Sequence, residues 1–327
     1  MKKHIKQFVP KGLLSGATCL VGMFCYLLFA TGNPGYAQDS TASAKQISNP
    51  IPAQDSSAPA KPAGIERVKN TFLGTFIIDN QSVMVPVKKT LEFTIQHRFG
   101  TINNKYNDFF GLFAGANVRF GASYTPINNM QVGVGLCEDK MQWDGNIKYA
   151  LSKQAVNHGC PVSVTYYGNM AVSTLPKKGN FVSNADRISY FSQLIVARKI
   201  TEHFSVQASP SYSYFNNVEG YMSSEGTIKP KMKNGHCAVA AMGCYTFTEK
   251  MGVIVNYDQP LTQHPTNNPH PNISFGIQIA TFTHTFQIFL GNYQSILPQA
   301  NNLYNQNDYT KSQYCIGFNI TKRWNYF

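Results

Sequence analysis

The sequence predicts an all-β protein, a closed antiparallel up-and-down transmembrane β-barrel of about twelve strands. Three observations predict this fold. Apolar residues recur at every second position along most of the chain after Leu91, long and short connections alternate between these stretches, and only 13% of the 327 residues are charged while 13% are aromatic. Soluble proteins average roughly 25% charged residues, so an ordinary charged surface is missing. A period of two gives each strand two unlike faces.

The first 37 residues have the three parts of a secretory signal peptide. Lysines between Lys2 and Lys11 precede the uncharged run GLLSGATCLVGMFCYLLFA, and small residues at Gly35 and Ala37 mark a cleavage site. We therefore expect cleavage after about Ala37. The length of the apolar run leaves a second interpretation open, a retained helix that spans the membrane once.

Residues 38–70 predict a disordered periplasmic linker. This segment contains four prolines among Ser, Ala and Lys and no aromatic residue. It cannot bury enough apolar surface to offset the entropy lost on ordering. Residues 71–327 are then the barrel domain. The start of that domain, residues 71–89, has three interpretations: it folds inward, it forms a first hairpin that raises the strand count to fourteen, or it belongs to the linker.

Twelve segments carry the alternation of apolar and polar residues. In the first of them Leu91 and Phe93 alternate with Glu92 and Thr94. The segments are residues 91–98, 117–124, 130–136, 143–151, 162–172, 188–200, 204–214, 239–247, 251–257, 273–279, 286–290 and 314–320. Most approach the roughly nine to eleven residues that a tilted strand needs to cross a bilayer, and an even number suits a closed antiparallel barrel.

The connections give an independent indication of a membrane barrel. Long polar stretches alternate with short links such as TPINN, TEH and TEK, although CEDKMQ is short for its side and SKQAVNHG is long. Outer-membrane barrels have short periplasmic turns and long extracellular loops, so the long stretches are expected outside the cell. The alternative, a soluble β-sandwich or lipocalin-like barrel, would carry more Lys, Asp and Glu on its polar face than this sequence has.

Charged residues at the polar positions of the alternation are candidates for lining the lumen. These residues are Glu92, Arg98, Arg119, Asp144 and Lys148. If they cluster, they form a charged constriction that selects solutes by sign and size. Alternatively, opposite charges pair and simply fill the lumen. Asp144 and Lys148, two lumen positions apart on one strand, are the expected salt bridge in that case.

Two histidines are the loop candidates. His264 and His270 lie six residues apart in HPTNNPHP, a spacing at which imidazoles can ligate a metal. The prolines between and beside them, with Asp258 as the one nearby carboxylate, favour a rigid extracellular loop instead. We predict no metal site and no cofactor.

The cysteines are expected to stay isolated. Five follow the signal peptide, an odd number that cannot pair fully within the chain. The alternation places Cys137, Cys244 and Cys315 on the lumen side and Cys237 on the lipid side. The sequence also lacks a GxSxG elbow, a Walker loop and a Rossmann fingerprint, so we assign no catalytic residue and predict no enzyme.

Several stretches of the chain resemble a known family. They are KTLEFTIQHRFG, DKMQWDGNIKYAL, CPVSVTYYGNMAV, NYDQPLTQHPTNNPHPNISFG, HTFQIFLGNYQSILPQ and IGFNITKRWNYF. Together they resemble an uncharacterised family of β-barrel outer-membrane proteins from Bacteroidota, a domain of unknown function, over residues 71–327. The resemblance implies a barrel in the cell outer membrane and implies no substrate.

The function that the sequence favours is porin-like passage of a small solute. A non-conducting barrel with a binding or structural role is the alternative, and an outer-membrane enzyme is a third. The expected partners are outer-membrane lipid, small solutes, and the barrel-assembly machinery during biogenesis. The net charge of +12 falls to about +8 when the four lysines of the signal peptide are removed, which suits anionic headgroups or an anionic solute, and no nucleic acid is predicted.

Overall fold

The structure, a computed structural model, describes residues 66–157, 159–178 and 180–325. The predicted signal peptide and the predicted linker up to residue 65 lie outside the described residues. The end of the predicted linker is described. Arg67 forms an isolated antiparallel bridge with Ala155, and the Val68 N–H donates to the carbonyl oxygen of Gln154 at 2.8 Å. The chain therefore approaches the barrel beside the connection that contains Gln154.

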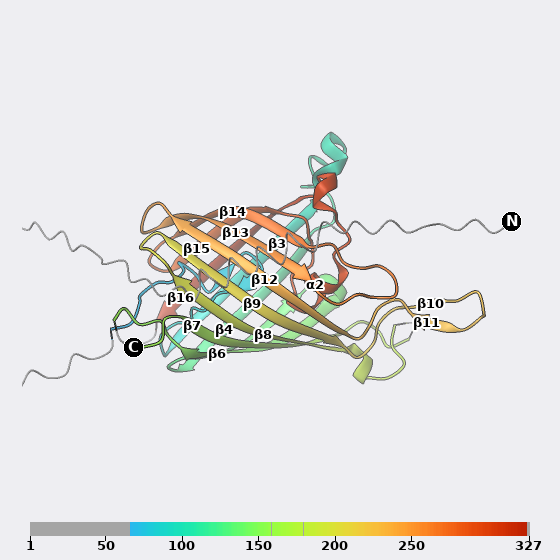
Figure 1. The fold of residues 1–327 in the computed structure, drawn as a ribbon. Helices are drawn as coiled ribbons and strands as arrows, with labels where there is room; N and C mark the ends of the chain where they lie inside the picture. The colour runs from blue at the N-terminus through green and yellow to red at the C-terminus, as the bar shows by residue number, and fades with distance from the viewer. Residues whose placement is uncertain (1–65, 158, 179, 326–327) are drawn as a thin grey trace, which may run out of the picture.

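Twelve antiparallel strands form a closed barrel (Figure 1). Each strand pairs with its neighbours in the sequence, and the last pairs with the first through partners such as Ile320 and Ile95. The strands are β3 (Thr90–Thr101), β4 (Asn117–Ile127), β5 (Met130–Cys137), β6 (Gln142–Ser152), β7 (Ser163–Ser173), β8 (Ile188–Lys199), β9 (Phe204–Phe215), β12 (Gly235–Thr246), β13 (Met251–Pro260), β14 (Asn272–Ala280), β15 (His284–Gly291) and β16 (Cys315–Asn325). The predicted fold class and strand count are confirmed.

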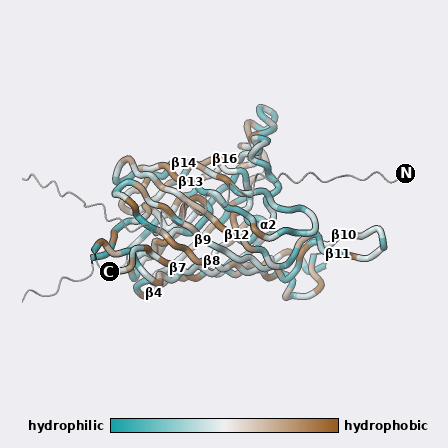
Figure 2. Tube along the Cα trace, viewed as in Figure 1, coloured by the Kyte–Doolittle hydropathy of each residue, from teal (hydrophilic) through white to brown (hydrophobic). Residues whose placement is uncertain are grey.

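The two faces of the strands differ as the alternation predicts. Large apolar side chains such as Trp143, Val134 and Ile288 are 54%, 57% and 65% exposed on the outside, whereas Gln207 and Asn256 are fully buried inside. Figure 2 shows hydrophobic and hydrophilic residues following one another along the strands. A soluble barrel would show the reverse distribution, because it buries its apolar face.

The barrel has a long-loop end and a short-turn end. Two residues join β4 to β5, and the longest connection at the short-turn end, between β6 and β7, is residues 153–162. No helix among the described residues is long and apolar enough to span a membrane. The long-loop end carries η1 (Ile102–Asp108), η2 (Asp139–Met141), η3 (Ala185–Arg187), the hairpin of β10 (Gly220–Met222) and β11 (Ile228–Pro230), α2 (Pro298–Tyr304) and η4 (Tyr309–Lys311).

The segment of residues 71–89 folds into the barrel, which selects one of the three sequence interpretations. Its strands β1 (Phe76–Ile77) and β2 (Asn80–Gln81) pair only with each other and add nothing to the wall. Residues 71–84, called the plug below, are buried or half-buried, and the last three residues before β3 are exposed. The strand count therefore stays at twelve rather than fourteen.

The five described cysteines are free, as expected. Cys137, Cys244 and Cys315 are buried inside the barrel, and Cys237 is exposed on the outside.

Candidate functional site

The candidate site is the lumen, and it contains all five charged side chains named from the sequence. Each is at most 6% exposed. They come from neighbouring parts of the wall, with Glu92 and Arg98 on β3, Arg119 on β4, and Asp144 and Lys148 on β6. Their contacts divide them into three separate groups. They do not form the single charged ring that a constriction needs.

The first group is a buried ion pair between Arg119 and Asp144. The guanidinium Nε and Nη2 donate to the two carboxylate oxygens, each at 2.8 Å, and Asn169 Nδ2 donates to the same carboxylate at 2.8 Å. A two-pronged contact of this kind is the strongest geometry for Arg and a carboxylate. The prediction of a salt bridge between Asp144 and Lys148 is wrong. Asp144 is bound by an arginine two strands away, which only the register of β4, β5 and β6 could reveal.

Two glycines make room for this ion pair. Gly121 and Gly135 are register partners on β4 and β5, and Gly135 is also the partner of Asp144 on β6. A Cβ added to Gly135 would overlap both Arg119 Nη2 and the Asp144 carboxylate. A side chain at position 135 would therefore force these two buried, paired groups to move.

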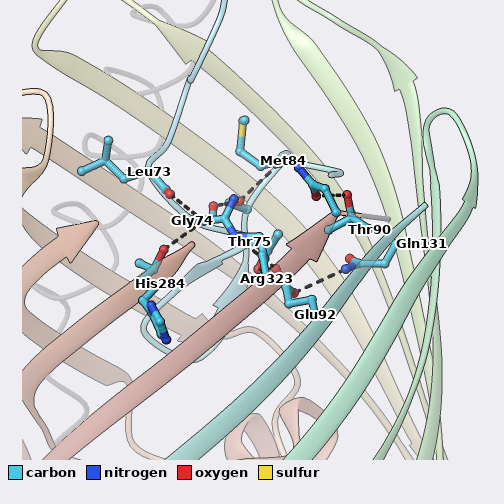
Figure 3. A network of polar contacts seen from close by, with 12 residues as sticks. Leu73, Gly74, Thr75, Met84, Thr90, Glu92, Gln131, His284 and Arg323 are labelled. Atoms are coloured by element: carbon cyan, nitrogen blue, oxygen red, sulfur yellow. Dashed lines mark hydrogen bonds and ion pairs between the residues drawn. The ribbon is translucent and has the colours of Figure 1, made fainter. Parts of the chain in front are cut away.

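The second group joins Glu92 and Lys148 to the plug, and Figure 3 shows Glu92 beside Thr75, Gln131 and Arg323. Thr75 Oγ1 donates to the Glu92 carboxylate at 2.9 Å, and Gln131 and Arg323 approach that carboxylate from the wall at 3.3 and 3.8 Å. The Lys148 ammonium donates to the Thr75 carbonyl oxygen at 3.0 Å. One residue of the plug thus lies between the two opposite charges and binds both.

Arg98 is the third group. Its Nη1 donates to Asn319 Oδ1 at 2.9 Å and to the carbonyl oxygen of His97 at 3.0 Å, and its guanidinium carbon lies 4.5 Å from the centre of the Phe289 ring. Asn319 Nδ2 in turn donates to the Ile78 carbonyl oxygen of the plug. Arg98 is therefore linked to the plug indirectly, through the side chain of Asn319.

Wall glutamines hold the two edges of the plug hairpin. Gln287 Nε2 donates to the Phe76 carbonyl oxygen at 2.9 Å, and its Oε1 accepts from the Ile78 N–H at 3.3 Å. Gln207 binds the other edge in the same way. Its Nε2 donates to the Gln81 carbonyl oxygen at 2.7 Å, and its Oε1 accepts from the Val83 N–H at 3.2 Å. Each carboxamide satisfies the plug backbone as the peptide group of a neighbouring strand would.

The tip of the plug is strained. Ile78 has φ +60° in the tight turn between β1 and β2, a backbone conformation that is rare for a β-branched residue. Its side chain is fully buried, and both of its backbone polar groups are bound by the wall. Surrounding contacts therefore hold the tip in a conformation that the chain would not adopt alone.

The plug meets a loop from the opposite end of the barrel. Asp79 accepts hydrogen bonds from the Tyr293 hydroxyl at 2.9 Å and from Asn301 Nδ2, both in the connection between β15 and β16. Asn256 Nδ2 donates to Asp79 at 3.0 Å and to Asp258 at 2.6 Å, so one amide bridges two buried carboxyl groups. The short helix α2, which carries Asn301, packs against β8, β9, β12 and β13.

Little space remains around the plug. Two voids that its residues line together with the wall have volumes of about 20 and about 10 Å³. A void of roughly 10 to 15 Å³ holds a single water molecule. At these two places the plug therefore packs closely against the wall.

The loop candidate His264 pairs with a histidine of the wall. His264 Nε2 lies 2.9 Å from His236 Nδ1, and His264 Nδ1 accepts from the Lys233 N–H at 3.0 Å. Because the Lys233 N–H can only donate, His264 carries its proton on Nε2 and donates it to His236. Burial, together with the positive charge of Lys233, lowers the pKa of His264. The other loop candidate, His270, donates its backbone N–H to Asn305 at 2.9 Å.

The structure gives these histidines no third ligand. Within residues 66–157, 159–178 and 180–325, no group of three or more His, Cys, Asp or Glu side chains is arranged to hold a metal ion. Because His236 Nδ1 accepts the proton of His264, the neutral His236 ring carries its own proton on Nε2, and that nitrogen cannot ligate a metal in this state.

Sequence reasoning missed the amides and the two carboxyl groups that hold the plug. A signal for the amides was present, because glutamine recurs at lumen positions of the alternation on many strands. Those glutamines are Gln96, Gln131, Gln193, Gln207, Gln278 and Gln287, and all are at most 4% exposed. The importance of Asp79 and Asp258 had no signal in the sequence, since it depends on where residues 71–84 lie.

Comparisons with known proteins agree with this architecture at the level of the family. Residues 72–324 match the family described as membrane bound beta barrel domain (DUF5777). The chain matches none of the curated proteins.

Three solved structures are similar to the chain at low identity. The NanC porin is 10% identical with a TM-score of 0.43, over 72% of this chain and 100% of the porin. The KdgM porin is 9% identical with a TM-score of 0.39, over 73% and 99%. An outer membrane channel from Pseudomonas putida F1 is 9% identical with a TM-score of 0.44, over 74% and 97%.

Proposed function

Because the chain belongs to the family of membrane bound beta barrel domains (DUF5777), we propose that it is an outer-membrane barrel that passes a small polar solute when the plug leaves the lumen. In this proposal the short-turn end faces the periplasm, the long loops lie outside the cell, and a signal peptide is removed after about Ala37. Origin in Bacteroidota belongs to the same proposal.

The observation that carries the proposal is how the plug is held. Side chains from eight of the twelve strands, β3, β6, β7, β8, β9, β13, β15 and β16, hydrogen-bond to it. Water can replace each of these bonds, since a typical intramolecular hydrogen bond contributes only about 0.5 to 1.5 kcal/mol net. The wall behind the plug would then be a hydrated surface of amides, hydroxyls and charges, which suits a polar solute.

The size of the barrel supports a separate plug. Eight strands leave an interior that their own side chains can fill, whereas sixteen to eighteen strands leave a water-filled channel. Twelve strands lie between these cases, so an interior this wide needs extra chain to close it. The plug supplies that chain, and because it precedes β3 it can withdraw toward the short-turn end without breaking the wall.

A planar-bilayer conductance measurement tests the proposal, using the full chain and a variant that lacks residues 71–84. Heat-dependent migration on a gel and a β-type circular dichroism spectrum establish that both barrels are folded. We expect the full chain to be mostly silent and the shortened barrel to conduct steadily, with the chloride-to-potassium preference read from the reversal potential. A folded but silent shortened barrel contradicts the proposal.

A second candidate function is a permanently closed barrel that binds a partner at the cell surface or has a structural role. It is favoured by the closure of the lumen from both ends, by the plug and by α2. The same deletion separates the two candidates, because in a permanently closed barrel the long-loop end would still block ions after residues 71–84 are removed.

A further inference from the structure

The connection between β3 and β4 carries a cluster of exposed apolar side chains. We call residues 105–113 the aromatic knob. Its large apolar side chains and their exposed fractions are Tyr106 81%, Phe109 55%, Phe110 37%, Leu112 39% and Phe113 82%. A single exposed apolar residue needs no explanation, but a contiguous patch of them marks a surface that binds something.

The aromatic knob has a defined shape. Ring centres lie 5.1 Å apart for Tyr106 and Phe110, and 5.9 Å apart for Phe109 and Phe113. The Phe110 N–H donates to the Lys105 carbonyl oxygen at 2.6 Å. Phe109 and Phe110 have φ of +52° and +58°, which is unusual for bulky residues. The backbone thus keeps the rings together on the outside of the loop.

The aromatic knob points away from the mouth of the barrel. Figure 1 shows η1, in teal, projecting sideways from the long-loop end instead of along the barrel axis. Its base is fixed at both sides, because the Ile102 N–H donates to the Tyr314 carbonyl oxygen at 2.8 Å and the Gly100 N–H donates to the Gly111 carbonyl oxygen at 3.0 Å. A rigid sideways projection therefore lies over the surface that surrounds the barrel at its long-loop end.

The strand that leads to the aromatic knob carries aromatic residues on its outer face. On the outer face of β3, His97 packs against Phe99 at 4.3 Å between ring centres, and it stacks on Phe318 of β16 at 5.0 Å. Phe99 is the last outward aromatic residue of β3, and the knob begins six residues later, in the connection that follows this strand. The knob is therefore close along the chain to the aromatic outer face of β3.

We propose that the aromatic knob lies in the interfacial region of the outer leaflet, where it anchors the long-loop end of the barrel to the lipid surface. Aromatic side chains are enriched at this depth of outer-membrane barrels, and tyrosine suits it because its ring is apolar and its hydroxyl is polar. The knob carries one positive charge, on Lys105, and one negative charge, on Asp108, so its apolar rings are its main contribution to binding. The surface bound is lipid, because the knob projects sideways from the barrel and directly follows a strand whose apolar face is turned outward. The proposal rests on membership of the membrane-barrel family and is independent of conduction.

Tryptophan fluorescence tests this inference. The chain has two tryptophans, Trp143 and Trp324, which are both replaced by phenylalanine. One of two substitutions is then made in this tryptophan-free background: Phe113→Trp in the aromatic knob, or Val182→Trp in the loop between β7 and β8. Val182 is 89% exposed, so it provides a matched position in another long loop. The full-length variants are reconstituted in phosphatidylcholine and phosphatidylglycerol vesicles, with or without brominated acyl chains.

We expect Phe113→Trp to emit at shorter wavelength, to lose most of its emission in brominated lipid and to be protected from aqueous iodide. Val182→Trp should show the opposite behaviour in all three readouts. Iodide quenching of Phe113→Trp without quenching by brominated lipid would overturn the proposal. So would a blue shift that appears only at high protein-to-lipid ratio, since that result indicates contact with a second copy. Equal heat-dependent migration of the two variants excludes misfolding as the cause.

Discussion

Asn301 of α2 donates its side-chain amide to the carboxylate of Asp79 at the tip of the plug, 222 residues away in the sequence. This contact joins a segment that precedes the first wall strand to a loop that precedes the last one. Tyr293, in the same loop, donates to the other oxygen of the Asp79 carboxylate at 2.9 Å. The plug and the long-loop closure therefore depend on a common carboxylate, and loosening one should loosen the other.

Replacing Asp79 tests this dependence. In Asp79→Ala three buried donors, from Tyr293, Asn256 and Asn301, each lose one acceptor. Tyr293 and Asn256 keep a second acceptor, on Ser274 and Asp258 respectively. Hydrogen bonds to a charged group contribute about 1.5 to 3 kcal/mol, so we expect the plug to open roughly tenfold to a hundredfold more often. Hydrogen exchange of the amides of residues 76–83 measures this. Lys88→Ala, at the exposed end of the segment, is the control. Unchanged exchange in Asp79→Ala would contradict the role given to this carboxylate.

Gly135 should be intolerant of any side chain. Its Cβ would force Arg119 and Asp144 apart, and breaking a buried ion pair costs about 3 to 5 kcal/mol when a charge is left without its partner. We therefore expect Gly135→Ala to destabilise the folded barrel by up to that amount, measured by denaturant unfolding in detergent micelles. A Cβ at Gly145, on the neighbouring strand, meets no atom within 4 Å. Gly145→Ala is the matched control, and equal stability of the two variants would refute the steric argument.

The pair of His264 and His236 should make the long-loop end sensitive to acid. The pKa of His264 is lowered in the folded protein, so the folded state binds its proton less readily than the unfolded chain does. The sign of the effect follows by linkage. Its stabilising contribution is complete above about pH 6.5, the value for an unperturbed histidine, and is lost as the pH falls from there toward the folded pKa.

The measurement is the midpoint temperature of the heat-dependent gel shift between pH 7.5 and pH 5. We expect the midpoint of the unaltered chain to fall as the pH drops below about 6.5. His264→Leu cannot titrate at this position, so its midpoint should change less over the same range. Parallel curves for the two proteins would show that another group causes the acid sensitivity.

The wall of the barrel was predictable from the sequence, whereas the pairing inside it was not. Alternation with period two reports which side of a strand each residue takes, and Glu92 and Arg119, at polar positions of the alternation, have buried side chains. Ion pairing depends on register instead. Asp144 and Lys148 face the same lumen, yet the register of β4, β5 and β6 brings Arg119 closer to Asp144. The spacing of residues within one strand does not reveal that register.

The plug shows a second limit of sequence reasoning. Residues 71–84 contain apolar residues such as Phe72 and Ile77 that favour burial, so an inward fold was among the interpretations. The choice could not be made, because the partners that decide it, such as Gln207 and Gln287, are distant wall residues that only the closed barrel brings together.

Neighbouring positions on β16 separate the two faces of the wall. Phe318 stacks on His97 outside the barrel, and Asn319 binds the plug inside. Phe318→Lys puts a charge on the lipid face. The free-energy cost of such a charge rises from the membrane surface to the midplane, and about 2 kcal/mol lies within that range. We therefore expect a smaller folded fraction after refolding into vesicles.

Asn319→Ala should insert normally and act on the plug. It removes the amide that binds the Ile78 carbonyl oxygen, and it deprives the buried guanidinium of Arg98 of its acceptor at 2.9 Å. We expect full-length Asn319→Ala to show more frequent conductance openings than the unaltered chain, because the strained tip at Ile78 loses a contact that holds it. In the variant lacking residues 71–84 the same substitution should leave opening frequency unchanged, since no plug remains. An equal effect in both backgrounds would mean that Asn319 acts on the wall and not through the plug.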